Sequence, residues 1–196
     1  MKPIITIDVD GVLLFWQTYA VEFCKTNGLC TKLAEKLQKS DEFINPFQID
    51  GVEQPDLIVK YNQSEFMERL KYYADAVDFI DKHKDHYEFI AITAMSPDEL
   101  YLGRRRRNLE KVFGRGVFSK VLGCHIRQSK KDLFNKVNIA YRDRVVAYID
   151  DMAHHLNDAK ECLPNAKLFH IIRDVREGAS VPCTIVSKLT QINLVD

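Results

Sequence analysis

Four short runs of this sequence are apolar at successive positions, and this feature constrains the fold most. They cover residues 3–7, 89–92, 145–149 and 167–172, with a weaker fifth run over 117–122. Runs that do not alternate with polar residues are typical of parallel strands covered by helices on both faces. Helical patterns lie between them, over 97–113, 130–137 and 153–162. The alternation predicts a doubly wound α/β fold with a parallel sheet.

The first interval breaks this rhythm, because some 80 residues separate Asp8 from the second apolar strand, far more than one crossover helix needs. We therefore expect an insert after the first strand. Helical patterns cover 19–26, 32–38 and 64–73, and an irregular stretch marked by Pro and Gly covers 45–56.

Composition describes an ordinary globular protein. The 196 residues carry 28 basic and 28 acidic side chains, and a neutral chain lacks the basic field on which dedicated nucleic-acid and membrane-surface binders rely. The five cysteines are scattered and form no C-x-x-C motif, which argues against a disulfide framework and a zinc site. No apolar run approaches the ~20 residues of a membrane span. These features predict a soluble, cytoplasmic protein with no membrane partner.

Acidic residues follow the predicted strands where their carboxyl ends should meet. Asp8 and Asp10 follow the first run, Thr93 follows the second, and Asp150 and Asp151 follow another. In an open parallel sheet this edge binds ligands. Crowded carboxylates need a cation, and hard oxygen ligands favour Mg²⁺ over zinc. A hydroxyl and a lysine of the segment 129–134 would suit a phosphoryl group, so the set predicts phosphoryl transfer.

These residues resemble the haloacid dehalogenase (HAD) superfamily of phosphohydrolases. Its four motifs occur in order: "DVDGV" from Asp8, Thr93 after "FIAI", a lysine in "SKKDLF", and Asp150-Asp151 after "VVAYI". The resemblance implies a HAD-like Rossmannoid three-layer α/β/α core over 1–15 and 76–196. The insert over 16–75 would be a small, mainly helical cap that covers the active site.

The resemblance also implies a role for each motif residue. Asp8 would be the nucleophile that forms an aspartyl phosphate, and Asp10 the general acid and then the base. Thr93 and the lysine would stabilise the transferring group. The motif Lys-x-Asp favours Lys130 over Lys131. Mg²⁺ would be held by Asp8, the backbone carbonyl of Asp10 and Asp151, with Asp150 assisting.

Within the superfamily, "DVDGVLLFW" looks most like the 5'(3')-deoxyribonucleotidase branch, in which an aromatic residue packs on the nucleobase. Trp16 stands at that offset, six residues after Asp10, and would bind substrate together with Thr93 and Ala94. Phe43 or Phe47 could form the other wall. The "FINPFQIDGVEQPD" segment matches that branch only loosely. A role of Trp16 in the core or the cap hinge is equally compatible with the pattern.

Other features have ordinary interpretations. The run "RRRR" (104–107) lies in a helical pattern near acidic residues, so we expect a solvated face; the alternative is contact with an anion or a nucleic acid. His154 and His155 are adjacent, so at most one of them should face the cleft.

The sequence thus predicts a Mg²⁺-dependent phosphomonoesterase that acts on a small phosphorylated substrate, a nucleoside (deoxy)monophosphate above others. Two alternatives stay open. One is a phosphatase acting on another small ester or on the phosphate at a polynucleotide end. The other is a receiver-like binding module, in which an aspartate accepts a phosphoryl group without turnover.

Overall fold

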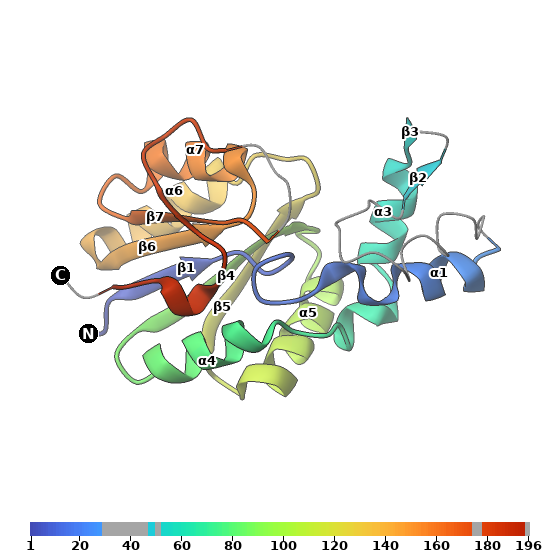
Figure 1. Cartoon of the computed structure of the whole chain (residues 1–196), viewed down its shortest axis with the longest axis horizontal. Helices are drawn as coiled ribbons and strands as arrows, with labels where there is room; N and C mark the ends of the chain where they lie inside the picture. Colours follow the sequence, from blue (N-terminus) through green and yellow to red (C-terminus); the bar gives the residue numbers. More distant parts are fainter. Residues whose placement is uncertain (29–46, 50–51, 174–177, 195–196) are drawn as a thin grey trace.

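The computed structural model describes residues 1–28, 47–49, 52–173 and 178–194, and a parallel sheet of six strands forms its centre (Figure 1). The strand order is β5-β4-β1-β6-β7-β8. The strands are β1 (Ile4–Ile7), β4 (Glu88–Met95), β5 (Phe118–His125), β6 (Val145–Asp150), β7 (Lys167–Ile171) and β8 (Thr184–Val186). Every neighbouring pair is parallel, which confirms the predicted sheet.

Helices cover both faces of the sheet. Helices α6 (Lys131–Tyr141) and α7 (Ala153–Cys162) lie on one face, and α4 (Ala74–His83) and α5 (Glu99–Phe113) lie on the other (Figure 1). Successive residues of β1 point to opposite faces of the sheet. Ile4 packs in the buried cluster that includes α6 and α7, and Ile5 packs in the cluster that includes α4 and α5. The runs are apolar at successive positions for this reason, and the three-layer α/β/α architecture is confirmed.

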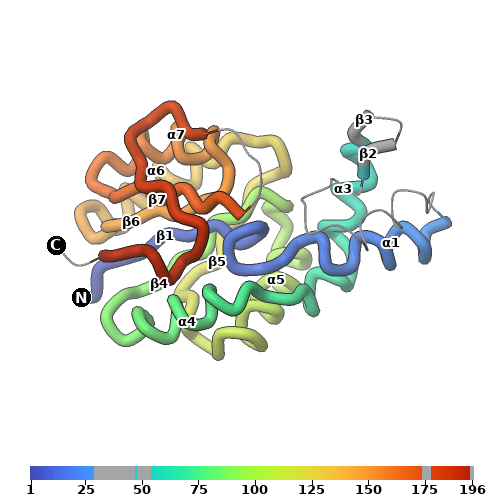
Figure 2. The backbone as a smooth tube through the Cα atoms, viewed as in Figure 1, coloured from blue at the N-terminus to red at the C-terminus, as the bar shows by residue number. Residues whose placement is uncertain are grey.

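The insert extends from the end of the sheet at which β1 finishes (Figure 2). Its described elements are the 3₁₀ helix η1 (Trp16–Tyr19), α1 (Ala20–Thr26), the antiparallel pair β2 (Gln48–Ile49) and β3 (Val52–Glu53), α3 (Pro55–Asn62) and the 3₁₀ helix η2 (Glu65–Glu68). The predicted helix over 19–26 is confirmed, whereas the one over 32–38 and Phe43 lie outside the described residues. The boundaries of the insert at 16 and 75 stay a prediction.

The expected helix over 64–73 is wrong. Only η2 forms there, and the chain then pairs with the segment that enters the insert: Tyr72 forms an antiparallel bridge with Leu14, and the Phe15 amide donates to the Lys71 carbonyl at 2.8 Å. This pairing outweighs the helical pattern. Helices form instead on either side, as α3 and α4.

Two strands of the sheet were predicted only weakly or not at all. β5 is an edge strand whose Ser119 and Lys120 are exposed, so its apolar pattern is interrupted although it runs for eight residues. β8 has three residues, two of them exposed, and was not predicted. Among the helices of the described ranges, none combines the length and the apolar character needed to cross a membrane.

Candidate active site

The first two acids follow β1 directly. Asp8 is buried, and its amide donates to the carbonyl of Ile149 at 2.9 Å, which extends the parallel ladder by one residue. The chain then turns away at Gly11, whose φ of +81° favours glycine. A Cβ at Gly11 would collide with the Asp151 carboxylate. Glycine therefore allows the end of β1 and the residues after β6 to approach each other.

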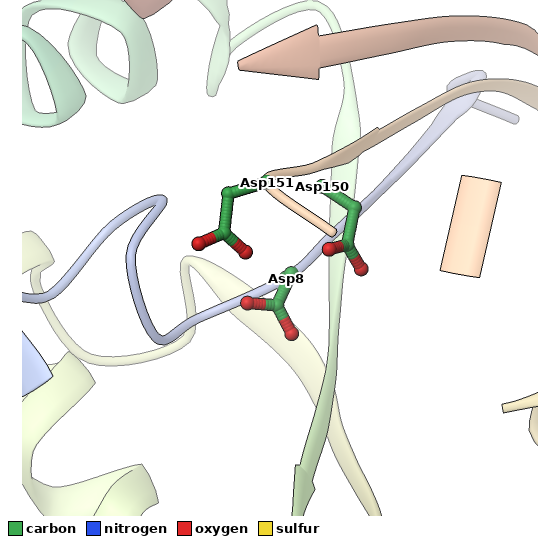
Figure 3. Close-up of side chains that lie close together, drawn as sticks. All are labelled: Asp8, Asp150 and Asp151. Carbon is green, nitrogen blue, oxygen red and sulfur yellow. The ribbon is translucent and has the colours of Figure 1, made fainter. Parts of the chain in front are cut away.

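Three carboxylates meet at this edge of the sheet. Asp8, Asp150 and Asp151 are all buried, and one oxygen from each lies within 4.8 Å of the others (Figure 3). Asp150 is fixed by the amide of Met152, which donates to its Oδ1 at 2.7 Å. The carboxylate of Asp10 is not part of this group; its predicted contribution as a ligand is the backbone carbonyl.

Lys130 lies at the centre of these acids, one residue before α6. Its Nζ donates to Asp8 Oδ1 at 2.5 Å and to Asp150 Oδ2 at 2.8 Å, and the side chain is fully buried. Lys131 is exposed and pairs with Glu161 at 2.7 Å on the surface. Of the two lysines in the motif, the structure brings Lys130 to the site and turns Lys131 away from it.

Burial sets the proton affinities of these groups. Desolvation raises the pKa of Asp8 to about 7; Lys130 opposes this rise, and the charges of Asp150 and Asp10 add to it. Burial also raises the pKa of Asp150, but Lys130, together with His155 and the Tyr148 hydroxyl, holds the pKa of that carboxyl below its usual range. The two carboxylates raise the pKa of Lys130 in spite of its burial. The ammonium group is therefore a permanent charge of the site.

Two residues that the sequence did not single out complete this network. Tyr148 is buried in β6, donates its hydroxyl to Asp150 Oδ2 in a short hydrogen bond, and accepts one from Lys130 Nζ at 3.3 Å. His170 in β7 places Nε2 3.1 Å from the Asp151 carbonyl oxygen. Both belong to apolar runs, so the period of the sequence marks them as core residues. Only their position next to a strand end could have drawn attention to them.

Thr93 lies near the end of β4 and is fully buried. Its hydroxyl donates to Asp10 Oδ2 at 3.5 Å, which is a long contact. Ala94 follows it in the same strand. The two predicted residues therefore lie beside Asp10, on the side of the site opposite Asp150, where β1 and β4 are neighbours.

Arg105 corrects the prediction of a solvated arginine run. Arg106 and Arg107 are exposed as expected, but Arg105 is fully buried, and its Nη2 lies 2.8 Å and 2.9 Å from the two carboxylate oxygens of Asp10. The helical period contains the signal, because Leu102, Arg105 and Leu109 share one face of α5. This position on the apolar face was overlooked because four consecutive arginines suggest an exposed, charged surface.

Trp16 lies in an aromatic cluster of the insert. Its indole N–H donates to Asn62 Oδ1 at 2.7 Å, and its ring meets those of Phe47 and Tyr61 edge-on, at centroid distances of 5.6 Å and 5.2 Å. The ring is half-buried. Its role in binding a base stays a prediction, as does that of Phe47.

Of the two histidines at the start of α7, His155 is buried and His154 is exposed, as the sequence predicts for adjacent helical residues. Burial lowers the pKa of His155 to about 3, and the nearby Lys130 adds to this effect. His155 is therefore neutral at physiological pH.

The donor set fits a hard divalent cation. Asp8, Asp10, Asp150 and Asp151 carry four negative charges if ionised, whereas Lys130 and Arg105 supply two positive ones. Mg²⁺ would balance the difference, and its usual ligands are carboxylate and carbonyl oxygens. Burial raises the pKa of Asp8, the charges of Asp150 and Asp10 add to this rise, and a bound cation would oppose it.

No known protein-family model matches the sequence. An uncharacterized 32.4 kDa protein from the Gp30-rIII intergenic region of Enterobacteria phage T4 is 40% identical over 166 residues, or 83% of this chain. The chain spans 59% of the length of that phage protein.

Solved structures of HAD-like proteins share the fold. YfnB from Bacillus subtilis, bound to magnesium, has a TM-score of 0.64 at 12% identity, and CbbY from Rhodobacter sphaeroides, in complex with phosphate, has 0.62 at 14%; each alignment covers 97% of this chain and 96% of the other. L-2-haloacid dehalogenase from Xanthobacter autotrophicus, with chloropropionic acid covalently bound, has 0.64 at 14% and covers 96% of both chains. The fold is therefore that of HAD-like hydrolases.

Proposed function

We propose that this protein is a Mg²⁺-dependent phosphomonoesterase of the HAD superfamily that works through an aspartyl phosphate. The observation that carries the proposal is the position of Asp8: it is buried in a group of three carboxylates and contacts Lys130 Nζ at 2.5 Å. A carboxylate in this setting is held rigidly beside a cation. That arrangement suits a nucleophile for an anionic phosphoryl group.

The reaction has two displacements at phosphorus. In the first, an Asp8 oxygen forms a bond to phosphorus while the bond from phosphorus to the ester oxygen breaks, and Asp10 gives that oxygen its proton. In the second, Asp10 takes a proton from water, the water oxygen bonds to phosphorus, and the bond to Asp8 breaks. Phosphate leaves, and both acids return to their first state.

The other residues of the site stabilise charge. Lys130 faces the nucleophile, and Thr93 is the hydroxyl nearest to Asp10, so both can contact the oxygens of the transferring group. Mg²⁺, when bound, offsets the repulsion between the phosphate and the carboxylates. Asp8, Asp151 and the Asp10 carbonyl would hold it, with Asp150 assisting.

For the substrate we propose a nucleoside (deoxy)monophosphate. The support is the aromatic cluster of Trp16, Phe47 and Tyr61, in which Trp16 lies on the segment that follows the acidic loop, six residues after Asp10. Stacking on an indole is worth about 1–3 kcal/mol for a base. The bound magnesium of YfnB and the bound phosphate of CbbY support the cofactor and the phosphoryl group on the same fold.

The test is release of phosphate by the purified protein with Mg²⁺. The panel contains ribo- and deoxyribonucleoside monophosphates, sugar phosphates, a 5'-phosphorylated oligonucleotide and acetyl phosphate, with Asp8→Asn as the matched control. Repeated turnover that peaks on nucleotides and disappears in Asp8→Asn is the expected result. A preference for the oligonucleotide would transfer the assignment to polynucleotide ends. Stoichiometric labelling by acetyl phosphate without turnover, or halide release from chloropropionic acid in place of phosphate, would refute the phosphatase.

A further inference from the structure

We propose that Arg105 is a positioning residue, which fixes the carboxylate of Asp10 and couples it to the docked insert. This inference rests on the proposed function, because Asp10 is there the group that exchanges a proton with the leaving oxygen and with water. Arg105 is not one of the four motif residues. It comes from the middle of α5, some 95 residues after Asp10 in the sequence.

The contact between Arg105 and Asp10 is close, and its arginine side is fully buried. Arg105 has no exposed surface, and a single nitrogen, Nη2, reaches both oxygens of Asp10 at 2.8 Å and 2.9 Å. The other side-chain partner of the Asp10 carboxylate is the Thr93 hydroxyl at 3.5 Å. A charged hydrogen bond below 3 Å restrains a carboxylate far more than a neutral one at 3.5 Å. Arg105 therefore sets the direction in which this carboxylate points.

The arrangement is also expensive. Nε and Nη1 of Arg105 are buried and have no hydrogen-bond partner among the described residues, so the guanidinium group is only partly compensated for its loss of water. A methionine or leucine at this position of α5 would fill the space without that penalty. Stability alone does not account for a buried arginine here, whereas a contact needed by Asp10 does.

The same helix docks the insert. Arg104 donates to the Gln63 carbonyl, Arg107 pairs with Glu68 at 2.5 Å, and Asn108 Nδ2 donates to the Leu70 carbonyl at 3.3 Å. These contacts attach the segment 63–70 to the arginine-rich part of α5. Figure 2 shows the chain between α3 and α4 running along α5.

Arg105 lies between this segment and the active site. The same Nη2 that contacts Asp10 lies 3.3 Å from the sulfur of Met67, in η2. Movement of η2 would therefore change the surroundings of the nitrogen that lies within 3 Å of both Asp10 oxygens. Arg105 thus couples the position of the proton donor to the docking of the insert, to which Arg104 and Arg107 of the same run also contribute.

The test compares leaving groups, because a residue that acts through the proton donor matters only when the leaving oxygen needs a proton. We compare kcat for the best alkyl phosphate with kcat for 4-nitrophenyl phosphate, whose phenolate leaves without one. Arg105→Met should lower kcat on the alkyl ester by about 10- to 100-fold, which is part of the roughly 10²- to 10⁴-fold that general acid catalysis contributes. The loss on 4-nitrophenyl phosphate should be several times smaller. Arg106→Met, on the exposed side of the same turn, is the matched control and should leave the ratio unchanged.

A double-mutant cycle separates positioning from a structural effect. If Arg105 acts through Asp10, the variant carrying both Asp10→Asn and Arg105→Met should be no slower on the alkyl ester than Asp10→Asn alone. Arg105→Lys, which retains the charge, is measured alongside in case the methionine variant does not fold. Arg105→Lys should also lose more kcat on the alkyl ester than on 4-nitrophenyl phosphate, but by a smaller factor than Arg105→Met.

The outcomes distinguish this inference from the function on which it rests. Equal losses on both esters, or losses that add in the double variant, would show that Arg105 merely supports the fold and would overturn the inference while leaving the phosphatase intact. No loss on either ester would overturn it too. A wild-type protein that hydrolyses neither ester would overturn both proposals.

Discussion

Lys130 is the residue on which the electrostatics of the site depend most directly, because it contacts Asp8 and Asp150 together in a buried space. Lys130→Met leaves two buried carboxylates without their cation. We expect a loss of phosphate release of about 10²- to 10³-fold, as for other single donors to a transition state. Without Mg²⁺ we also expect the free energy of unfolding to fall by roughly 3–5 kcal/mol.

The neighbouring lysine is a matched control, since Lys131 makes its ion pair on the surface. Lys131→Met should change the free energy of unfolding by less than about 1 kcal/mol, as is usual for exposed pairs, and should leave turnover intact. Chemical unfolding and steady-state kinetics on both variants decide the matter. Equal effects of the two substitutions would contradict the arrangement around Asp8.

Residue-level patterns in the sequence located Asp8, Asp150 and Asp151, because polar side chains that directly follow apolar strands stand out from the pattern. Arg105 and Tyr148 did not stand out. Tyr148 occupies one more apolar position of β6. Arg105 is one of four consecutive arginines, of which Arg106 and Arg107 are exposed and Arg104 is partly exposed. A sequence shows the period of a helix but not which buried position of that period faces a ligand site.

At the scale of elements, the core strands and helices followed from local pattern, and the failures came from long-range pairing. The segment 64–73 has apolar residues at helical spacing, but its end must pair with Leu14 so that the chain can return to the sheet. Local propensity carries no information about that partner some 58 residues earlier. Helix α4, which begins at Ala74 directly after this pairing, was not predicted although Ala76, Phe79 and Ile80 recur at helical spacing.

Helix α5 offers a test of local propensity that is independent of function. Gly103 lies in its interior, and an added Cβ would meet only Arg107 Nη1, at 3.5 Å. Alanine should fit there and limit the unfolded chain, so Gly103→Ala should raise the free energy of unfolding by about 0.5–1 kcal/mol. Urea unfolding measures this difference. A decrease would mean that the packing of α5 against the insert is tighter than the structure shows.

Arg173, two residues after the end of β7, forms a clamp between neighbouring segments of the chain. Its guanidinium donates to the carbonyls of Gly11 and Val12 at 3.2 Å and 3.0 Å, pairs with Asp75 at 3.0 Å, and lies 3.8 Å from the centre of the Tyr73 ring. It therefore joins the loop after the nucleophile to the chain that returns from the insert.

Arg173→Met should loosen this junction. We expect faster hydrogen exchange at the amides of Phe15 and Tyr73, whose bonds to Lys71 and Leu13 close the two crossing segments, because local opening becomes easier. Exchange within β6 should not change. If the amides of all elements exchange faster to the same degree, the effect is on global stability and the clamp has no local role.

At the scale of the whole molecule, the acidic site makes stability depend on pH and on metal. An aspartate titrates near pH ~4 in an unfolded chain, whereas burial raises the pKa of Asp8 to about 7 in the folded protein. The folded state thus binds this proton more tightly. The contribution of Asp8 to stability is greatest below pH ~4 and is lost as the pH rises through about 7. Bound Mg²⁺ should restore part of what is lost.

His155 has the opposite dependence. Its pKa falls to about 3 in the folded state, so its contribution is present above the unfolded value near ~6.5 and is lost as the pH falls. The pH profile of the wild-type protein therefore mixes two signs between about pH 4 and 6.5. Comparison with Asp8→Asn removes the histidine from the result, because both proteins contain it.

In the presence of EDTA, Asp8→Asn should have a higher Tm than the wild-type protein at pH 8, and this advantage should shrink at pH 5, where the Asp8 carboxyl is protonated and resembles the neutral amide. Mg²⁺ should raise the Tm of the wild type more at pH 8 than at pH 5, and should raise that of Asp8→Asn less at either pH. Calorimetry at both pH values gives these differences, with the exposed Asp85→Asn as control. A Tm difference between Asp8→Asn and wild type that does not vary with pH would mean that Asp8 is ionised throughout. The groups around the nucleophile, Lys130 first among them, would then outweigh its burial, as the groups around Asp150 do there.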